Sequence, residues 1–316
     1  MSPVWSNEMA YLAVDLGGSH VTCGVVADGS LLAYDVLPLT DSQNLAPILP
    51  ALSDTLLRLR GTVGYPIKGV GVGFCGLVHE GKNRVVSTNG KFVDAPGLDL
   101  NRWAASTFQA PLRIANDARL ALRGEMAAGA GKGESNIFMF TLGTGIGGVA
   151  ALDGRPPSGA HGLAACLGGH VSVTLRGRRC TCGGQGCAES EASGWALPVI
   201  CREQPDFAQS RLSGMELNFL NLFTLAEAGD AVAIRVRDHC LRVWGVMTVS
   251  AVLAYDPAVV IFGGGVMKAA NVILPSVREY VRLNTWTPLS QPRIVAAALG
   301  NQAALYGAAS LFEEIR

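Results

Sequence analysis

The alternation of apolar runs with turn residues predicts two halves that are built in the same way. In the first half, short β-rich apolar runs bounded by turn residues predict five strands, at 11–15, 20–27, 31–37, 70–74 and 112–115. Helical spacing and good helix formers predict three helices, over 44–60, around Ala104 and over 117–128. The expected order is β-β-β-α-β-α-β-α, which opens with a meander of three strands.

The second half repeats this order of elements. Short apolar runs predict four strands, at 136–142, 146–152, 259–262 and 293–297. Helical patterns predict three helices, over 231–254, 272–283 and 301–314. We interpret the repeat as a duplicated α/β architecture that clamps a nucleotide, with an N-terminal lobe at 1–130 and a C-terminal lobe at 131–316. The boundary falls in the glycine-rich stretch 129–133.

Composition narrows the class of protein without identifying it. The chain carries 25 basic and 25 acidic side chains, and this balance argues against a nucleic-acid-binding surface. The N-terminus lacks the basic and apolar segments of a signal peptide. The uncharged stretches 135–152 and 156–175 are broken by glycines, so we expect no membrane span. Without a secretion signal, the cysteines are expected to be thiols or metal ligands of a cytoplasmic protein.

A first candidate phosphate loop follows the first predicted strand. Asp15 ends the apolar run, and Gly17, Gly18 and Ser19 come directly after Leu16. Glycines at such a turn let backbone N–H groups approach phosphate oxygens closely, and Ser19 adds a hydroxyl donor. Asp15 is placed to hold Mg²⁺ directly or through water. A plain tight hairpin turn is the alternative interpretation.

A second candidate phosphate loop contains Gly143, Thr144 and Gly145. Together with Gly148 it formally matches the dinucleotide fingerprint G-x-G-x-x-G, but that site needs a helix directly afterwards. The sequence continues as a strand instead, which excludes a Rossmann site. We therefore predict a strand–turn–strand loop that binds the phosphates of ATP.

A third glycine cluster, at Gly264 and Gly265, stands between a predicted strand and a predicted helix. Ligands bind at this end of the strands in open α/β sheets, and this position suits the adenine and ribose of a nucleotide. A turn that permits close packing of strand and helix is an equally good interpretation.

Two polar residues, Asn116 and Asp117, mark the point where a buried strand meets a helix. Asp117 has two possible roles at this position. It is either the cap of the helix or the base that takes a proton from a hydroxyl attacking ATP. The surrounding phosphate loops favour the second role, with Asn116 binding the same sugar.

Cys180, Cys182 and Cys187 form the pattern C-x-C-x₄-C, and His170 precedes it by ten residues. Three thiolates and one imidazole make a closed tetrahedral Zn²⁺ site, which is structural and not hydrolytic. Free thiols are the alternative interpretation. The neighbouring arginines are interpreted as a solvated rim, at positions 176, 178 and 179.

In this order, these motifs resemble the ROK family (repressors, open reading frames and sugar kinases). The resemblance extends from Ala13 to the final helix. It rests on residues 15–19, 116–117, 142–148, 169–170, 180–189 and 262–266. The family implies an actin-like ATPase fold, with two ribonuclease H-like lobes around a central cleft and a small zinc-binding loop.

The resemblance also implies an activity and residue roles. The reaction is transfer of the γ-phosphate of ATP, bound with Mg²⁺, to a hexose hydroxyl, often that on C6. Asp117 is the base. Sugar contacts come from Asn89, Asn116, His170 and Glu189, with His170 bridging to zinc through its other ring nitrogen. The family further implies a homodimer or homotetramer.

The chain departs from the family pattern G-E-x-G-H. The residues before Gly169-His170 are Cys166, Leu167 and Gly168, so the carboxylate that grips sugar hydroxyls is missing. Glucose is therefore a default substrate, with N-acetylmannosamine or allose as alternatives, and a non-catalytic sugar sensor is a further hypothesis. ROK repressors carry a helix-turn-helix segment ahead of the kinase-like part. The first loop here begins at Asp15, which argues against DNA binding by this chain.

Overall fold

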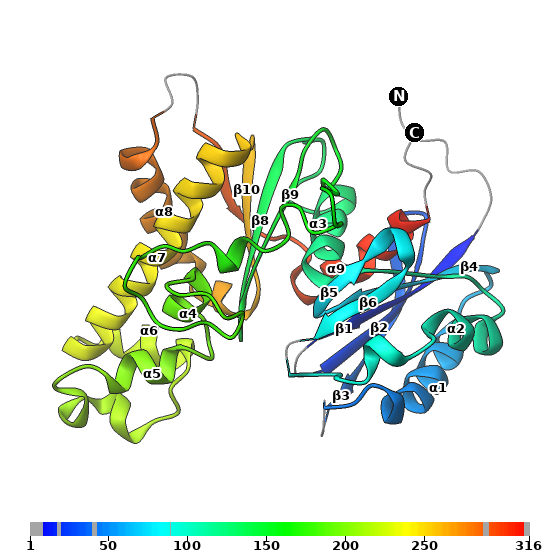
Figure 1. Cartoon of the computed structure of the whole chain (residues 1–316), viewed down its shortest axis with the longest axis horizontal. Helices are drawn as coiled ribbons and strands as arrows, with labels where there is room; N and C mark the ends of the chain where they lie inside the picture. Colours follow the sequence, from blue (N-terminus) through cyan, green and yellow to red (C-terminus); the bar gives the residue numbers. More distant parts are fainter. Residues whose placement is uncertain (1–8, 18–19, 40–42, 89, 287–290, 313–316) are drawn as a thin grey trace. The chain divides into compact units, whose positions relative to one another are not determined.

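The computed structural model describes the chain except residues 1–8, 18–19, 40–42, 89, 287–290 and 313–316. Its contacts divide the chain into two compact units, shown in Figure 1. The N-terminal unit comprises residues 1–133, 156–166 and 298–316, and the C-terminal unit comprises residues 134–155 and 167–297. The expected boundary after residue 130 is close to the observed one. The expected C-terminal lobe is wrong in two segments, because 156–166 and 298–316 pack in the N-terminal unit.

The N-terminal unit is built on a five-stranded sheet in the order β3-β2-β1-β4-β7. Its strands are β1 (Ala10–Leu16), β2 (His20–Ala27), β3 (Ser30–Pro38), β4 (Ile67–Phe74) and β7 (Leu112–Asn116). β1 pairs antiparallel with β2 and parallel with β4, which pairs parallel with β7. The carboxyl ends of β1, β4 and β7 therefore share one edge of the sheet.

Helices cover both faces of this sheet. They are α1 (Leu49–Arg60), α2 (Leu100–Phe108), α3 (Asp117–Ala128) and α9 (Ala303–Ala308). Alternate residues of β1 point to opposite faces. Leu12 packs in the larger core with Leu52, while Ala13 packs with Leu305 of α9. The closing helix thus completes the second face of the N-terminal sheet, although it is distant in sequence.

The sequence pattern predicted most elements of this unit. The three-strand meander and α3 are confirmed with nearly the expected bounds. The helix expected over 44–60 begins at Leu49 after a 3-10 turn. Of the helix expected over 301–314, the part described, up to residue 312, is α-helical at Ala303–Ala308 and is flanked there by 3-10 turns. A hairpin of β5 (Gly76–His79) and β6 (Arg84–Thr88) was missed, because its strands are short and carry polar residues.

The C-terminal unit has a four-stranded sheet in the order β11-β10-β8-β9. Its strands are β8 (Ile137–Leu142), β9 (Ile146–Ala151), β10 (Val259–Gly263) and β11 (Arg293–Ala296). An antiparallel hairpin, β8–β9, is extended by two parallel strands, as β2–β1 is by β4 and β7 in the other unit. The two halves therefore repeat one topology, as the sequence predicted.

Figure 1 shows the long helix α7 (Ala231–Tyr255) and α8 (Ala270–Asn284) beside this second sheet. Three further helices were missed by the sequence analysis: α4 (Ala188–Ala192), α5 (Leu197–Arg202) and α6 (Phe219–Glu227). Trp244 of α7 is fully buried and donates from Nε1 to the Ala192 carbonyl, 3.2 Å away, which joins α4 to the core. Within the described part of the chain, no helix combines the length and apolarity needed to cross a membrane.

Gly124→Ala should destabilise the protein, although alanine favours helices. A Cβ on Gly124 of α3 would overlap the carbonyl oxygen of Ala303 in α9, and backbone cannot move aside as a side chain can. We expect a loss of about 1–3 kcal/mol in the free energy of unfolding, measured by denaturant titration. Gly64→Ala is the control, because nothing lies within 4 Å of its Cβ position. A stabilised Gly124→Ala variant would contradict close packing of α3 and α9.

Candidate functional site

Two acidic residues meet at the carboxyl edge of the N-terminal sheet. Asp15 lies near the end of β1, and Asp117 begins α3 directly after β7. Gly73 of β4 stands between them in the sheet, paired with Asp15 on one side and with Ala115 on the other. A Cβ on Gly73 would lie 3.3 Å from Oδ1 of Asp15 and 3.5 Å from Cα of Asp117. Because Gly73 has no side chain, the space beside the two acids stays open.

Burial makes both acids reluctant to ionise. Desolvation, with the negative charge of Asp117 as a smaller cause, raises the pKa of Asp15 to about 7. Desolvation raises the pKa of Asp117 to about 6, although hydrogen bonds from Ala118 N–H (2.8 Å) and Asn116 Nδ2 (2.9 Å) act in the opposite direction. Oδ1 of Asp15 is buried and has no hydrogen-bond partner among the described residues. A buried, unpartnered carboxylate oxygen beside a second acid fits a divalent cation such as Mg²⁺.

Asn116 is the residue that caps α3. Its Oδ1 accepts from the N–H groups of Ala118 (3.1 Å) and Arg119 (3.3 Å), and its Nδ2 donates to the Gly76 carbonyl (3.2 Å) as well as to Asp117. The structure therefore gives the helix cap to Asn116. Among the described residues, the hydrogen bonds to the Asp117 carboxylate from Ala118 and Asn116 reach one oxygen, Oδ1.

The remaining N-terminal candidates are only partly described. Gly17 follows β1 in a tight turn, where a Cβ would lie 3.0 Å from the His20 carbonyl oxygen. Gly18 and Ser19 of the first phosphate loop and Asn89 of the expected sugar site lie outside the described residues. Their roles stay predictions.

The turn between β8 and β9 presents two free backbone donors. Gly143 N–H donates within the turn to the Gly145 carbonyl at 3.0 Å. The N–H groups of Thr144 and Gly145 have no hydrogen-bond partner among the described residues. Nothing lies within 4 Å of a Cβ built on Gly143, so this side of the turn is open. Adjacent unpaired N–H groups at an open glycine turn form an anion-binding concavity.

The two glycines of the third cluster fit different interpretations: one is a packing turn, and the other has room for a ligand. Gly264 has a φ of +90°, and a Cβ there would overlap the backbone of Leu142, so this glycine is a packing turn between β10 and β8. Gly265 faces open space and begins the 3-10 turn Gly265–Ala269 that leads to α8. Only Gly265 has room for a ligand within its own unit.

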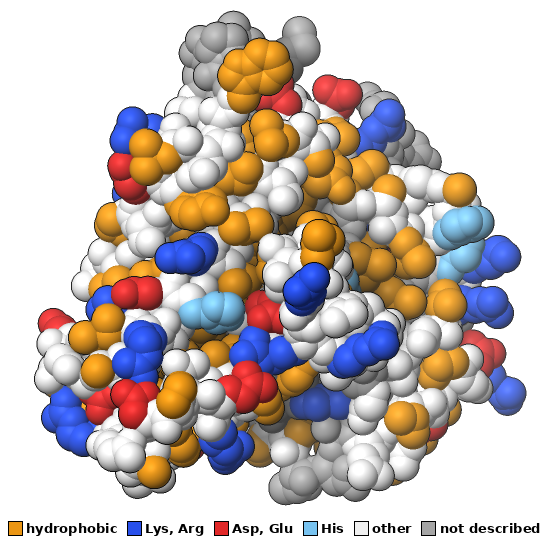
Figure 2. Space-filling view, turned by 60° about the vertical axis from the view of Figure 1, so that its left-hand side comes forward, with side chains coloured by type: hydrophobic (Ala, Val, Ile, Leu, Met, Phe, Trp, Pro, Cys, Tyr) orange, Lys and Arg blue, Asp and Glu red, His pale blue; other side chains and the backbone are white. Residues whose placement is uncertain are grey.

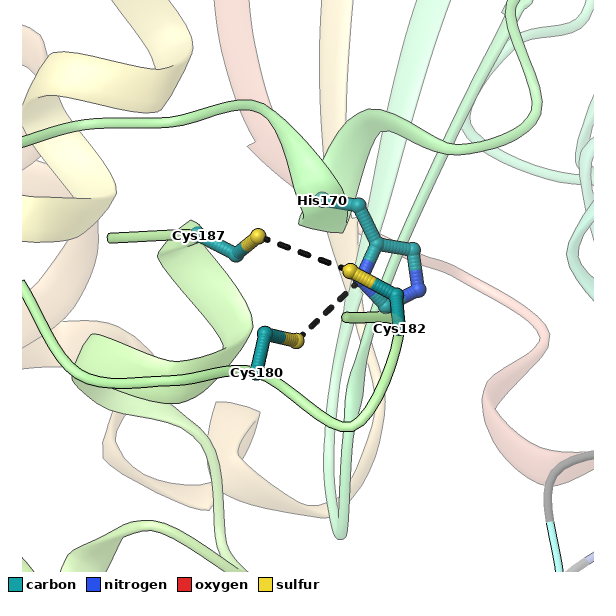
Figure 3. A group of neighbouring side chains, drawn as sticks. All are labelled: His170, Cys180, Cys182 and Cys187. Atoms are coloured by element: carbon teal, nitrogen blue, oxygen red, sulfur yellow. Dashed lines mark hydrogen bonds between the residues drawn. The ribbon is translucent and has the colours of Figure 1, made fainter. Parts of the chain in front are cut away.

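The four predicted zinc ligands lie together in the C-terminal unit (Figure 3). The ligand atoms of His170, Cys180, Cys182 and Cys187 lie within 4.8 Å of one another. The Cys182 and Cys187 sulfurs are 3.7 Å apart, and the Cys180 sulfur is 3.6 Å from Nδ1 of His170. A tetrahedron with Zn–S bonds of about 2.3 Å separates its sulfurs by about 3.8 Å. The donor set and spacing therefore fit Zn²⁺.

An ion-paired arginine fastens the zinc loop (Cys180–Cys187) to α4. Arg178 donates from its backbone N–H to Oε1 of Glu191 (2.6 Å) and from NH1 to Oε2 (2.5 Å), and it also pairs with Glu203. The rim interpretation is thus wrong for Arg178. These groups line a groove of about 450 Å³ together with His239 and Arg242 of α7. On the face shown in Figure 2, basic and acidic side chains gather around a histidine.

Glu189 lies beside this loop, and its carboxylate is directed at the β8–β9 turn. It is 8% exposed, its Oε2 accepts from Ile146 N–H at 2.8 Å, and its Oε1 accepts from Nε1 of Trp195 at 3.3 Å. The sequence analysis assigned Glu189 to the sugar by resemblance and missed its bond to the turn. Trp195 carries no sequence signal for this contact.

A buried arginine holds the segment 156–166. Arg119, on the first turn of α3, is 3% exposed and donates to Oε1 of Glu80 (2.9 Å) and to the carbonyls of Pro157 (2.8 Å) and Ala164 (2.6 Å). Cys166, at the end of this segment, donates to the Leu163 carbonyl at 3.2 Å. Arg119 was missed because its position in the sequence resembles an exposed helical residue.

The stability of the protein should fall as the pH rises, because of Asp15. An acid whose pKa is about 7 when folded and 3.8 when unfolded keeps a proton only in the folded protein between these values. The free energy of unfolding should therefore decrease from about pH 4 to about pH 7. Asp15→Asn should remove the part of this decrease that Asp15 causes and stabilise the protein at pH 8 by up to about 4 kcal/mol, while changing little at pH 4. The raised pKa of Asp117 should leave a shallower decrease in the variant. Denaturant titrations at both pH values test this, and an unchanged pH slope in the variant would contradict it.

Purified protein should contain one Zn²⁺ per chain by elemental analysis. Cys182→Ser should lose the metal and with it sugar affinity, because a structural site needs all four ligands. Cys201→Ser, on α5, is the matched control, since Cys201 lies outside the ligand cluster. Zinc-free wild-type protein, prepared without chelators, would count against the assignment.

The comparisons with known proteins agree with this geometry. The model of the ROK family matches residues 11–315. The chain is 31% identical to a glucokinase of Streptomyces coelicolor, over 96% of this chain and 97% of that protein. A ROK hexokinase from Thermus thermophilus superposes with a TM-score of 0.78 at 29% identity, over 96% and 97% of the two chains.

A ROK family glucokinase from Streptomyces griseus, in complex with glucose and AMPPNP, gives the same TM-score of 0.78 at 29% identity, over 96% of this chain and 98% of its own. These likenesses confirm the actin-like ATPase fold that the motifs implied. With the family model matching almost the whole chain, this protein belongs to the ROK family.

Proposed function

We propose that this protein is an ATP-dependent hexose kinase that transfers the γ-phosphate of ATP to a sugar hydroxyl. The observation that carries the proposal is the pair of buried acids, Asp15 and Asp117, at one sheet edge. Phosphoryl transfer needs a base near the acceptor hydroxyl and a cation near the phosphates, and this pair supports both roles. The glucokinases of the two Streptomyces species support the same reaction class.

Asp117 is the base in this proposal. A pKa of about 6 leaves it largely ionised at pH 7 and still able to hold a proton taken from the attacking hydroxyl. The two hydrogen bonds to one of its oxygens fix the carboxylate, so the other oxygen is left to accept the sugar hydroxyl. Asp15 would hold Mg²⁺, which when bound with ATP neutralises the charge of the phosphates.

The phosphates of ATP are assigned to two glycine turns. The free N–H groups of Thr144 and Gly145 support the turn at 143–145 as one of them. Gly17, Gly18 and Ser19 are proposed as the other, and the region of Gly264 and Gly265 is proposed to lie near the adenosine. Of these last two, Gly265 has the open space that a ligand contact needs.

The sugar is assigned to Asn89, Asn116, His170 and Glu189, with glucose as the first substrate to test and C6 as the acceptor position. In the zinc loop, Nδ1 of His170 faces Cys180, which supports use of its other nitrogen for the sugar. Cys166 and Leu167 occupy the region where the family carries a carboxylate. This difference keeps N-acetylmannosamine and allose as alternative substrates.

A non-catalytic sugar sensor is the second candidate function, because the missing carboxylate removes a hydroxyl acceptor. Turnover separates the two candidates. A sensor binds a hexose without releasing ADP, whereas a kinase releases ADP in proportion to the sugar phosphate formed. The relevant protein is the zinc-loaded full chain.

A coupled ADP-release assay over hexoses and N-acetylated amino sugars should detect turnover with at least one sugar. Asp117→Asn should reduce kcat by about 10²–10⁴-fold while sugar affinity, measured by calorimetry, stays within about threefold. Asp28→Asn is the control, because Asp28 is exposed in the turn between β2 and β3 at a positive φ that asparagine tolerates. Wild-type protein that binds sugar and turns over none of the panel would overturn the kinase in favour of the sensor.

A further inference from the structure

The β8–β9 turn is held from behind by the segment that follows the zinc loop. Gly194 N–H donates to the Gly143 carbonyl at 2.9 Å, and Trp195 N–H donates to the Thr144 carbonyl at 2.9 Å. The carboxylate of Glu189 accepts from Ile146 N–H at 2.8 Å. The carbonyls of Gly143 and Thr144 and the first N–H of β9 are therefore hydrogen-bonded. The N–H groups of Thr144 and Gly145 have no partner among the described residues.

The β8–β9 turn and the segments around the zinc ligands are in direct contact. A Cβ on Gly145 would lie 2.6 Å from Oε2 of Glu189, and a Cβ on Gly194 would lie 2.8 Å from the Gly143 carbonyl oxygen. The turn that bears His170 also packs here, because a Cβ on Gly169 would overlap the carbonyl of Ile146. Glycine at these positions therefore permits contact between the turn and the zinc-bearing segments.

Glu189 is joined closely to the zinc ligands. It stands two residues after Cys187, on the first turn of α4. Ala188 N–H donates to the Val171 carbonyl at 3.0 Å, next to His170. Glu191, two residues further along, receives the two bonds from Arg178, which stands just before the zinc loop. A short helix of five residues has little stability of its own, so its position depends on these anchors.

We propose that Glu189 is a positioning residue for the nucleotide. Its carboxylate fixes the β8–β9 turn with the N–H groups of Thr144 and Gly145 exposed, and the zinc loop in turn fixes Glu189. The metal site thereby controls affinity for ATP as well as for sugar. This inference rests on the proposed function in one respect, namely that the turn receives the phosphates.

Two substitutions at Glu189 separate its hydrogen bond to the β8–β9 turn from its negative charge. Glu189→Gln keeps an acceptor for Ile146 N–H but removes the negative charge and the acceptor for Nε1 of Trp195, whereas Glu189→Ala removes both acceptors. Calorimetry with the non-hydrolysable analogue AMPPNP, in the absence of sugar, should give about tenfold weaker binding for Glu189→Ala and binding within about threefold of wild type for Glu189→Gln. Glu227→Ala, at an exposed acid on α6, is the control.

Zinc removal should act through the same contact. Cys182→Ser, or wild type stripped of zinc by a chelator, should show weaker AMPPNP binding of similar size to Glu189→Ala. Combining Cys182→Ser with Glu189→Ala should add little, because both changes release one anchor. Equal and additive losses would overturn the inference, and so would AMPPNP binding by Glu189→Ala that matches wild type.

Hydrogen exchange gives a readout that does not need nucleotide. Amides at 143–147 should exchange at least tenfold faster in Glu189→Ala and Cys182→Ser, while amides of β1 and β4 keep their wild-type rates. If wild type binds AMPPNP and turns over no sugar, the proposed function fails, and weaker AMPPNP binding by Glu189→Ala would still support this inference. If wild type binds no AMPPNP, the proposed function and the nucleotide role of Glu189 both fail, and faster exchange at 143–147 in the variants would support only the anchoring of the turn.

Discussion

The cost of burying negative charge at one sheet edge is the constraint on which the N-terminal unit depends. β1, β4 and β7 end together because they are parallel, and a glycine at position 73 leaves the space beside two aspartates unfilled. Within the described part of the chain neither acid forms an ion pair with a basic group, and burial raises both pKa values. An arrangement that lowers stability at neutral pH is expected where the charge is used, since a bound cation removes the penalty.

The C-terminal unit has a different constraint. The segment between His170 and Cys187 must be ordered, although it has almost no core of its own. Between His170 and Cys187 the side chains are mostly polar or glycine, and Val171 and Leu175 are exposed. Such a segment cannot offset its conformational entropy by apolar burial. A Zn²⁺ ion held by the four candidate ligands would supply the missing stabilisation, and the Arg178–Glu191 pair would transfer that order to α4. In the proposal above, the metal would thereby stabilise the β8–β9 turn, where the N–H groups of Thr144 and Gly145 have no partner among the described residues.

Sequence reasoning succeeded where the signal is local and periodic. The strands of both sheets, the duplicated topology and the proximity of the four candidate zinc ligands follow from apolar runs, glycine turns and cysteine spacing. It failed where a residue acts through distant backbone. The sequence pattern predicts Arg119 as a surface residue of a helix, whereas in the structure it is buried and bonded to carbonyls of the segment 156–166. The packing of α9 in the N-terminal unit also has no local signal, because it is fixed by contact with Gly124.

In the proposed kinase, the replacement of the family carboxylate would limit how the sugar is selected. Cys166 is buried, and burial raises the pKa of its thiol, so it stays neutral at pH 7 and is a weak donor. A neutral thiol already bonded to the Leu163 carbonyl does not replace a charged acceptor of two hydroxyls. Arg119 offers no compensation, because arginine is a donor only and its two terminal nitrogens are occupied by Glu80 and two carbonyls. In the proposed kinase, discrimination among hexoses would therefore come from the acceptors that remain, chiefly Asp117 and Glu189, and we expect a broader sugar range than that of a carboxylate-bearing site.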